Sequence, residues 1–335
     1  MKRGYRALVL VTTCLAFIVV TVGAYVRLMD AGLGCPDWPG CYGELSPAHA
    51  ASDIAGAVAA QGGEHGPVSL RKAWKEMFHR YLAGTLGLLI LAITVVTWRR
   101  RAALRASPGL PVALLALVIL QAALGMWTVT LLLKPVIVTL HLLGGMATLA
   151  LLVWLSLREL SLRSPGLPRA SRLRIMAAAA LAVLITQIAL GGWVSSNYAA
   201  LACVDFPTCH GEWIPQMDFE HGFQLVRELG RTAAGTHLAY QALTAIHWTH
   251  RIGAVLTVLF VGALCIGLLR VRDTAGYGVM LALILAIQVA LGVANILAGL
   301  PLAVAVAHNA VAALLLVTLV VINFALSRVS SEFSP

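Results

Sequence analysis

Residues 110–133 read LPVALLALVILQAALGMWTVTLLL, without a single Asp, Glu, Lys or Arg. A membrane-spanning helix needs about 20 consecutive apolar residues, so this run predicts one. Seven further runs without those four residue types cover residues 7–26, 81–98, 136–157, 175–197, 252–269, 277–298 and 300–326. The sequence therefore predicts an all-α polytopic membrane protein with eight transmembrane helices.

The composition of the 335 residues agrees with this fold class. Hydrophobic residues make up 60% of the chain and charged residues only 11%, which excludes a soluble enzyme. The net charge of +10 comes from short basic clusters between the apolar runs, and no nucleic-acid-reading motif accompanies them. We therefore expect the lipid bilayer, and no nucleic acid, as a partner.

The basic residues predict the orientation of the chain. Fifteen of the 24 Lys and Arg residues fall at the termini and in every second loop, against seven in the remaining loops. Because Lys and Arg are retained on the cytoplasmic side, both termini are predicted to be cytoplasmic. The long loops at about 29–75 and 198–243 are then extracytoplasmic, and the protein is placed in the cell (inner) membrane.

The chain repeats itself. Cys35-Pro-Asp-Trp-Pro-Gly-Cys41 recurs 168 residues later as Cys203-Val-Asp-Phe-Pro-Thr-Cys209. Four helices belong to each copy, so the repeat predicts two four-helix bundles, residues 1–165 and 166–335. Since four crossings return the chain to its starting side, the bundles are expected to be related by a pseudo-two-fold axis along the membrane normal.

A shorter phrase follows the same repeat. Gln121-Ala-Ala-Leu-Gly125 recurs as Gln288-Val-Ala-Leu-Gly292, and the phrase appears once more as Gln187-Ile-Ala-Leu-Gly191. The third copy indicates an older unit of two helices.

Four histidines occupy matched places in the predicted membrane helices: His79, His141, His250 and His308. Ionisable residues inside a membrane are functional candidates by default. Two imidazoles on neighbouring helices suit the axial positions of a haem iron. Zinc would need further ligands, and neither half offers an obvious set in the membrane. We expect the His79–His141 and His250–His308 pairs to bind haem roughly 8 to 12 Å below the outer surface, at 1.5 Å per helical residue.

Glycines surround these histidines: Gly84, Gly87, Gly144, Gly145 and Gly253. Their small size would admit a macrocycle, and close helix packing explains them equally well. Arg80 and Arg251 follow their histidines at the water boundary. They could pair with haem propionates or simply extend to the interface.

The repeat breaks at one position. Glu76 lies three residues before His79, whereas His247 lies three residues before His250. A partly buried carboxylate near a haem edge is suited to taking up protons from an oxidised substrate. The Cys35–Cys41 and Cys203–Cys209 pairs have a spacing that can close disulfides in an oxidising compartment, as structural staples or as a redox relay.

At these residues the sequence resembles the heme A synthase family. The resemblance covers about residues 5–326 and includes these pieces: Gly23-Ala-Tyr-Val-Arg27, Gly32-Leu-Gly-Cys-Pro-Asp-Trp-Pro-Gly-Cys41, Glu76-Met-Phe-His79-Arg80, His141-Leu-Leu-Gly-Gly145, Thr249-His250-Arg251 and His308-Asn309. It implies oxidation of the C8 methyl of haem O to a formyl group, giving haem A by way of a hydroxylated intermediate.

The resemblance also implies roles for the site residues. His250 and His308 would hold a resident haem b, His79 and His141 the substrate haem O, and Glu76 would be the catalytic carboxylate. His247 matches no known role in the family, and part of the family lacks the second cysteine pair. Implied partners are haem O synthase and an unidentified electron acceptor or donor, and a homo-oligomer is left open.

Three other classes share some of these features. A diheme b-type electron-transfer protein would show the same four histidines without needing Glu76 in one half alone. A membrane thiol oxidoreductase would use the cysteines without the intramembrane histidines. A transporter could have parallel repeats, but it should line a path through the midplane with polar groups, and the middles of these predicted helices lack charged residues and offer only isolated polar ones.

Overall fold

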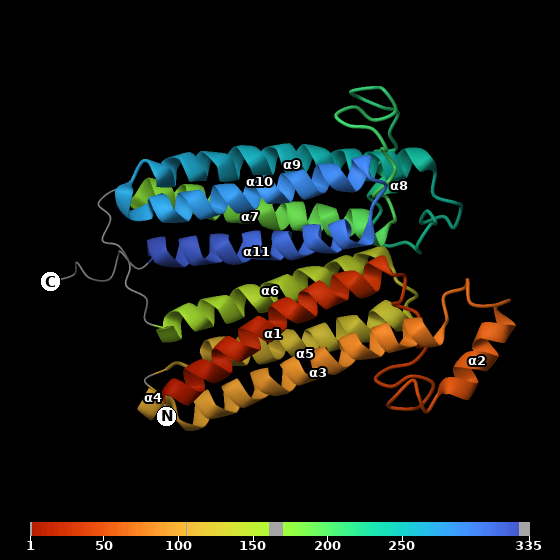
Figure 1. The fold of residues 1–335 in the computed structure, drawn as a ribbon, viewed down its shortest axis with the longest axis horizontal. Helices are drawn as coiled ribbons and strands as arrows, with labels where there is room; N and C mark the ends of the chain where they lie inside the picture. The colour runs from red at the N-terminus through yellow and green to blue at the C-terminus, as the bar shows by residue number, and fades with distance from the viewer. Residues whose placement is uncertain (1, 105, 161–169, 328–335) are drawn as a thin grey trace. The chain divides into compact units, whose positions relative to one another are not determined.

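The computed structural model describes residues 2–104, 106–160 and 170–327, and helices dominate this part of the chain (Figure 1). Eight helices are long and apolar enough to cross a membrane. They are α1 (Lys2–Leu28), α3 (Leu70–Arg99), α5 (Gly109–Thr130), α6 (Pro135–Leu160), α7 (Ala170–Ser196), α9 (Tyr240–Leu269), α10 (Ala275–Leu297) and α11 (Leu302–Ser327). The predicted eight-helix, multi-pass membrane protein is confirmed.

Four short helices complete the fold: α2 (Ala51–Ala60), α4 (Arg101–Leu104), α8 (Phe219–Gly222) and the 3-10 helix η1 (Arg272–Thr274). The chain divides into two compact units: Met1–Thr148 with Gln224–Leu238, and Leu149–Phe223 with Ala239–Pro335. The predicted boundary between residues 165 and 166 lies within 161–169, outside the described residues.

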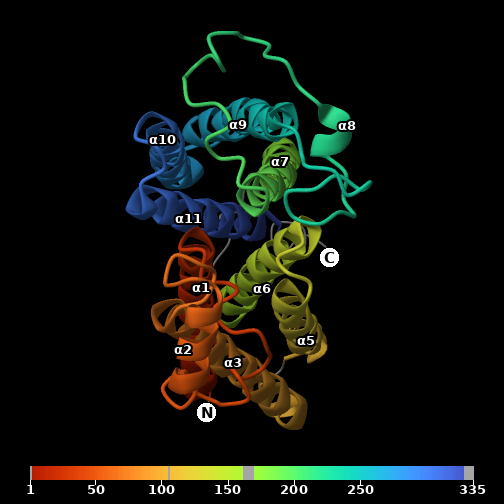
Figure 2. The same cartoon turned by 90° about the vertical axis from the view of Figure 1, so that its right-hand side faces the viewer.

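Each unit contains a bundle whose helices follow the same cyclic order. In the first unit α1 packs on α3 and α3 on α5, Gly125 of α5 contacts His141 of α6, and Gly145 of α6 faces Val20 of α1. In the second unit α7 packs on α9, α9 on α10, α10 on α11 and α11 on α7 (Figure 2). The two-fold relation and the cytoplasmic termini stay predictions.

Two helices begin earlier than their charge-free runs indicated. α3 begins at Leu70 instead of residue 81, and α9 at Tyr240 instead of residue 252. A run without charged residues indicates which part of a helix lies in hydrocarbon. The helix itself can extend beyond that run, through turns whose charged residues have polar partners. At α3 the Ser69 hydroxyl caps the first turn by accepting from the backbone N–H of Lys72 at 3.2 Å. His79 therefore lies more than two turns inside its helix, not just inside its end.

The loop between α1 and α3 contains a helix that the sequence did not predict. α2 packs its Ile54 into a small core that includes the disulfide Cys35–Cys41 and also Ala73 and Met77 of α3. This apolar cluster anchors the loop on the N-terminal end of α3.

The two cysteine loops have the same conformation. The structure contains the disulfides Cys35–Cys41 and Cys203–Cys209, as predicted. In each loop one aspartate accepts hydrogen bonds from two consecutive backbone N–H groups just after the second cysteine. They are Asp37 with Tyr42 and Gly43, both at 2.7 Å, and Asp205 with His210 and Gly211 at 2.7 and 2.9 Å. The internal repeat thus extends from the sequence to the folding of the loops.

The loop topology can be tested with an impermeant maleimide in a Cys14→Ser/Cys265→Ser protein, in which only the four loop cysteines remain. We expect intact cells to be labelled only after an impermeant reductant has opened the disulfides, because both loops are predicted to be extracytoplasmic. Labelling before reduction would show free thiols. Labelling only after lysis would overturn the orientation.

Candidate functional site

The four candidate histidines lie at corresponding depths in their helices. His141 and His308 are each six residues beyond the first residue of α6 and α11, respectively, which places them about 9 Å along the helix axis. His79 and His141 lie near enough to interact electrostatically, as do His250 and His308. The structure therefore brings each predicted pair together within one bundle.

Every one of these rings lies edge-on against a glycine of the preceding membrane helix. A Cβ atom added to the glycine would come within 3.0 to 3.3 Å of the ring carbon Cε1. The pairs are Gly23 with His79 (3.0 Å), Gly125 with His141 (3.3 Å), Gly191 with His250 (3.2 Å) and Gly292 with His308 (3.1 Å). Sequence reasoning missed these glycines as site residues, although three of them end the repeated Gln-x-x-x-Gly phrase.

The glutamines of that phrase also lie at the histidines. The amide nitrogen of Gln187 is 3.1 Å from Nδ1 of His250 and donates to the carbonyl of the same residue at 3.0 Å. The amide nitrogen of Gln288 is 3.3 Å from Nε2 of His308. In these two copies the repeated phrase therefore contacts a histidine at two points, through the glycine and through the glutamine one helical turn before it.

The glycines near the histidines serve different purposes. Gln121 lies against Gly144, and Gln187 lies against Gly253, three residues after the histidine in both cases. An added Cβ would overlap either glutamine. Gly84 and Gly87, in contrast, meet nothing within 4 Å where a Cβ would be. Packing of a glutamine side chain accounts for Gly144 and Gly253.

Three of the four imidazoles have a ring nitrogen without a protein partner. All four rings are half-buried, and Nδ1 of His79, His141 and His308 is buried without a hydrogen-bond partner. Unsatisfied polar atoms are costly inside a bundle. Within the described residues no group of three or more His, Cys, Asp and Glu side chains gathers as a metal site. Two imidazoles in each unit are a donor set that would fit a haem iron.

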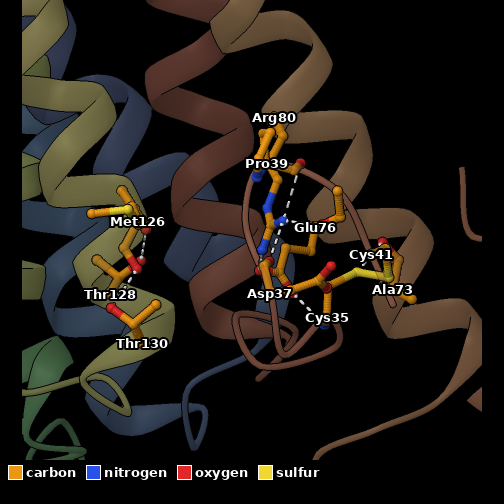
Figure 3. A network of polar contacts seen from close by, with 12 residues as sticks. Cys35, Asp37, Pro39, Cys41, Ala73, Glu76, Arg80, Met126, Thr128 and Thr130 are labelled. Carbon is orange, nitrogen blue, oxygen red and sulfur yellow. Dashed lines mark hydrogen bonds and ion pairs between the residues drawn. A yellow bond between two sulfur atoms is a disulfide. The ribbon is translucent and has the colours of Figure 1, made fainter. Parts of the chain in front are cut away.

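Arg80 fastens the first cysteine loop to α3 (Figure 3). Its guanidinium donates to the carbonyls of Asp37 (2.8 Å), Pro39 (3.3 Å) and Gly40 (2.5 Å) and pairs with Oε1 of Glu76 at 2.6 Å. The other carboxylate oxygen of Glu76 accepts from the backbone N–H of Cys35 at 2.9 Å. Glu76 is 4% exposed, so a buried ion pair supports the disulfide loop.

Arg251 fastens the second loop to α9 in the same way. Its guanidinium donates to the carbonyls of Cys203 (2.8 Å), Asp205 (2.9 Å) and Thr208 (2.8 Å). Nδ1 of His247 accepts from the backbone N–H of Cys203 at 3.2 Å. His247 therefore occupies the place of Glu76: each receives the N–H of the first cysteine, one as a carboxylate and the other as an imidazole.

The loop aspartate adds to the electrostatics of this fastening. Hydrogen bonds from the Thr208 hydroxyl and from the backbone N–H groups of Gly211 and His210 hold the pKa of Asp205 well below its usual range. The side chain stays ionised and keeps its loop folded around it at neutral pH.

The fold and the site define a multi-pass membrane protein with a pair of half-buried histidines in each of two four-helix bundles. The chain belongs to the cytochrome oxidase assembly protein family COX15-CtaA, which it matches over residues 6–320. It is 41% identical to a heme A synthase of Shewanella oneidensis over 97% of both chains. It is also 30% identical to one of Rhizorhabdus wittichii, over 92% of this chain and 90% of the relative.

Replacing Arg80 should destabilise the protein more than replacing Arg251. Arg80→Ala would leave the buried Glu76 charge without its partner, which typically costs about 3 to 5 kcal/mol, whereas Arg251→Ala leaves a His247 that needs no counter-ion. We expect thermal unfolding of the purified protein to show the larger loss for Arg80→Ala. Adding Glu76→Gln should restore part of that loss. Equal losses for the two arginine variants, with no restoration, would contradict the ion-pair explanation.

Proposed function

We propose that this protein is a haem A synthase, which oxidises the C8 methyl of haem O to a formyl group and so produces haem A. Membership of the COX15-CtaA family and the relatives named heme A synthase support this proposal. The observation that carries it is the matched set of four half-buried histidines, one pair in each compact unit. An enzyme that takes haem as substrate and as cofactor needs two such ligand pairs.

The two halves of the chain have different roles in this proposal. His250 and His308 hold a resident haem b, which supplies one-electron redox chemistry when bound. His79 and His141 hold the haem O substrate and orient its methyl group. The fit rests on the proximity of His250 and His308 and on the bare backbone of Gly191 and Gly292, which the edges of the two rings closely approach.

Glu76 is the proposed catalytic carboxylate. It lies one turn before His79, and its negative charge would accept the protons released as the methyl is oxidised. Arg80 holds the carboxylate in place at 2.6 Å. Propionate binding by Arg80 and Arg251 requires exchange of loop carbonyls for carboxylate oxygens, since both guanidinium groups donate to the loops.

We further place the protein in the cell (inner) membrane, with both haem sites toward the extracytoplasmic side, as the distribution of Lys and Arg indicates. Haem O synthase is the proposed source of the substrate. The oxidation requires an electron acceptor where water supplies the formyl oxygen, and an electron donor where O2 supplies it. We assign this role to a membrane redox partner.

The resident haem can be tested by spectroscopy. The protein should purify red with haem b, and His250→Ala or His308→Ala should remove that absorbance, because each variant deletes one of two axial ligands. Quantifying the Soret band and extracting the haem distinguish the outcomes. A full Soret band in both variants would refute the ligand assignment, and haem b with neither haem O nor haem A would indicate a diheme electron-transfer protein.

The role of Glu76 can be distinguished from that of its structural counterpart, His247, by a matched pair of variants. Glu76→Gln keeps the size and one acceptor for the Cys35 N–H but removes the charge, so methyl oxidation should slow by about 10²- to 10⁴-fold. Haem extracted from cells should then be dominated by haem O and its alcohol. His247→Gln is the control, because it replaces the acceptor of the Cys203 N–H at the corresponding place in the other loop without removing a charge.

Haem A at wild-type levels in Glu76→Gln cells would reject the catalytic assignment. An equal loss of haem A in His247→Gln cells would show that both side chains act by holding their loops, and that the two halves do not divide the work.

A further inference from the structure

One contact occurs four times in the described residues: the Cε1 edge of a histidine ring lies against the backbone of a glycine on the preceding membrane helix. The added-Cβ distances span only 3.0 to 3.3 Å over the four sites. Two of the glycines, Gly23 and Gly191, are separated by the same 168 residues as the cysteine loops, so the contact belongs to the repeated unit.

The contact fixes the direction in which the ring nitrogens face. Cε1 is the ring carbon between Nδ1 and Nε2. Glycine backbone packed against Cε1 therefore prevents the ring from turning toward the neighbouring helix. At Gly23 the added Cβ would also lie 3.5 Å from Nε2 and 3.7 Å from Nδ1 of His79. A methyl group at this point would displace the ring by a few tenths of an ångström or rotate it. An iron ligand would tolerate neither change well, because the nitrogen that would bind the iron moves with the ring.

We propose that Gly23, Gly125, Gly191 and Gly292 are positioning residues, which set the orientation of the four haem-ligating imidazoles by offering bare backbone to each ring edge. The inference rests on the proposed haem-binding function. It assigns a role to residues whose presence in helix interiors is otherwise unfavourable, because glycine destabilises a helix relative to alanine.

Another glycine of the membrane helices shows that the contact is selective. Gly262 of α9 meets no atom within 4 Å of an added Cβ. Alanine at this position should therefore be accepted, and it provides a control for the general effect of a Gly→Ala change in a membrane helix.

The test uses the resident pair in the purified holoprotein. In Gly191→Ala and Gly292→Ala we expect haem to transfer to apomyoglobin roughly tenfold faster than from the wild type, the usual scale for outer-shell changes at a metal ligand. The low-spin ferric signal in electron paramagnetic resonance should shift. Gly262→Ala should match the wild type in both measurements. Wild-type haem transfer and an unshifted signal in Gly191→Ala and Gly292→Ala would overturn the proposal.

A second measurement needs no haem and covers the case in which a variant is unstable. If the methyl acts on the ring, Gly191→Ala should lower the Tm by about 3 °C or more when His250 is present. It should not lower the Tm when combined with His250→Ala, where the ring is absent. Equal losses in both backgrounds would contradict ring positioning. A wild-type protein that binds no haem would instead refute the proposed function. The comparison of Tm values would still test whether Gly191 positions the His250 ring.

Discussion

An imidazole edge set against bare glycine backbone is the contact on which the arrangement of both bundles depends. Because the glycine has no side chain, the polar, ionisable ring can lie between helices in an apolar environment. The neighbouring glutamine of the Gln-x-x-x-Gly phrase adds a polar contact to the ring at His250 and at His308. The same residues thus take part in helix packing and position the rings of the proposed haem ligands.

The second constraint is the fastening of each cysteine loop over its histidine-bearing helix. Arg80 and Arg251 donate to three loop carbonyls each, and the side chain one turn before each arginine receives the N–H of the first cysteine. The hydrogen-bonding pattern is common to both loops, whereas the charge is not. Glu76 brings a negative charge near the proposed substrate pair, and His247 brings a neutral acceptor near the resident pair. The same local structure can therefore serve two chemically unequal sites.

Much of this fold could be predicted, because hydrocarbon imposes a strong constraint on sequence. Charge-free runs revealed all eight membrane helices, and the repeated Cys-x5-Cys motif revealed both disulfides. The start of α3 at Leu70 was missed because the charge-free run begins only after Arg80. The packed helix α2 was missed because it lies in a loop, beyond the reach of that constraint.

The site was predictable in its histidines and not in its supports. A histidine in an apolar run is conspicuous, while a glycine in a membrane helix has many explanations, and only coordinates show that Gly23 faces His79. Sequence spacing placed Glu76 beside His79 but did not reveal that both of its carboxylate oxygens are engaged, one by Arg80 and the other by Cys35. The role of His247 became visible only as a hydrogen bond to the loop.

The most direct test of two histidine pairs holding two haems is an experimental structure of the purified protein loaded with haem O, with iron located by anomalous scattering. The account predicts two iron positions, one between His79 and His141 and one between His250 and His308. A single iron, or iron bound away from these four rings, would contradict it.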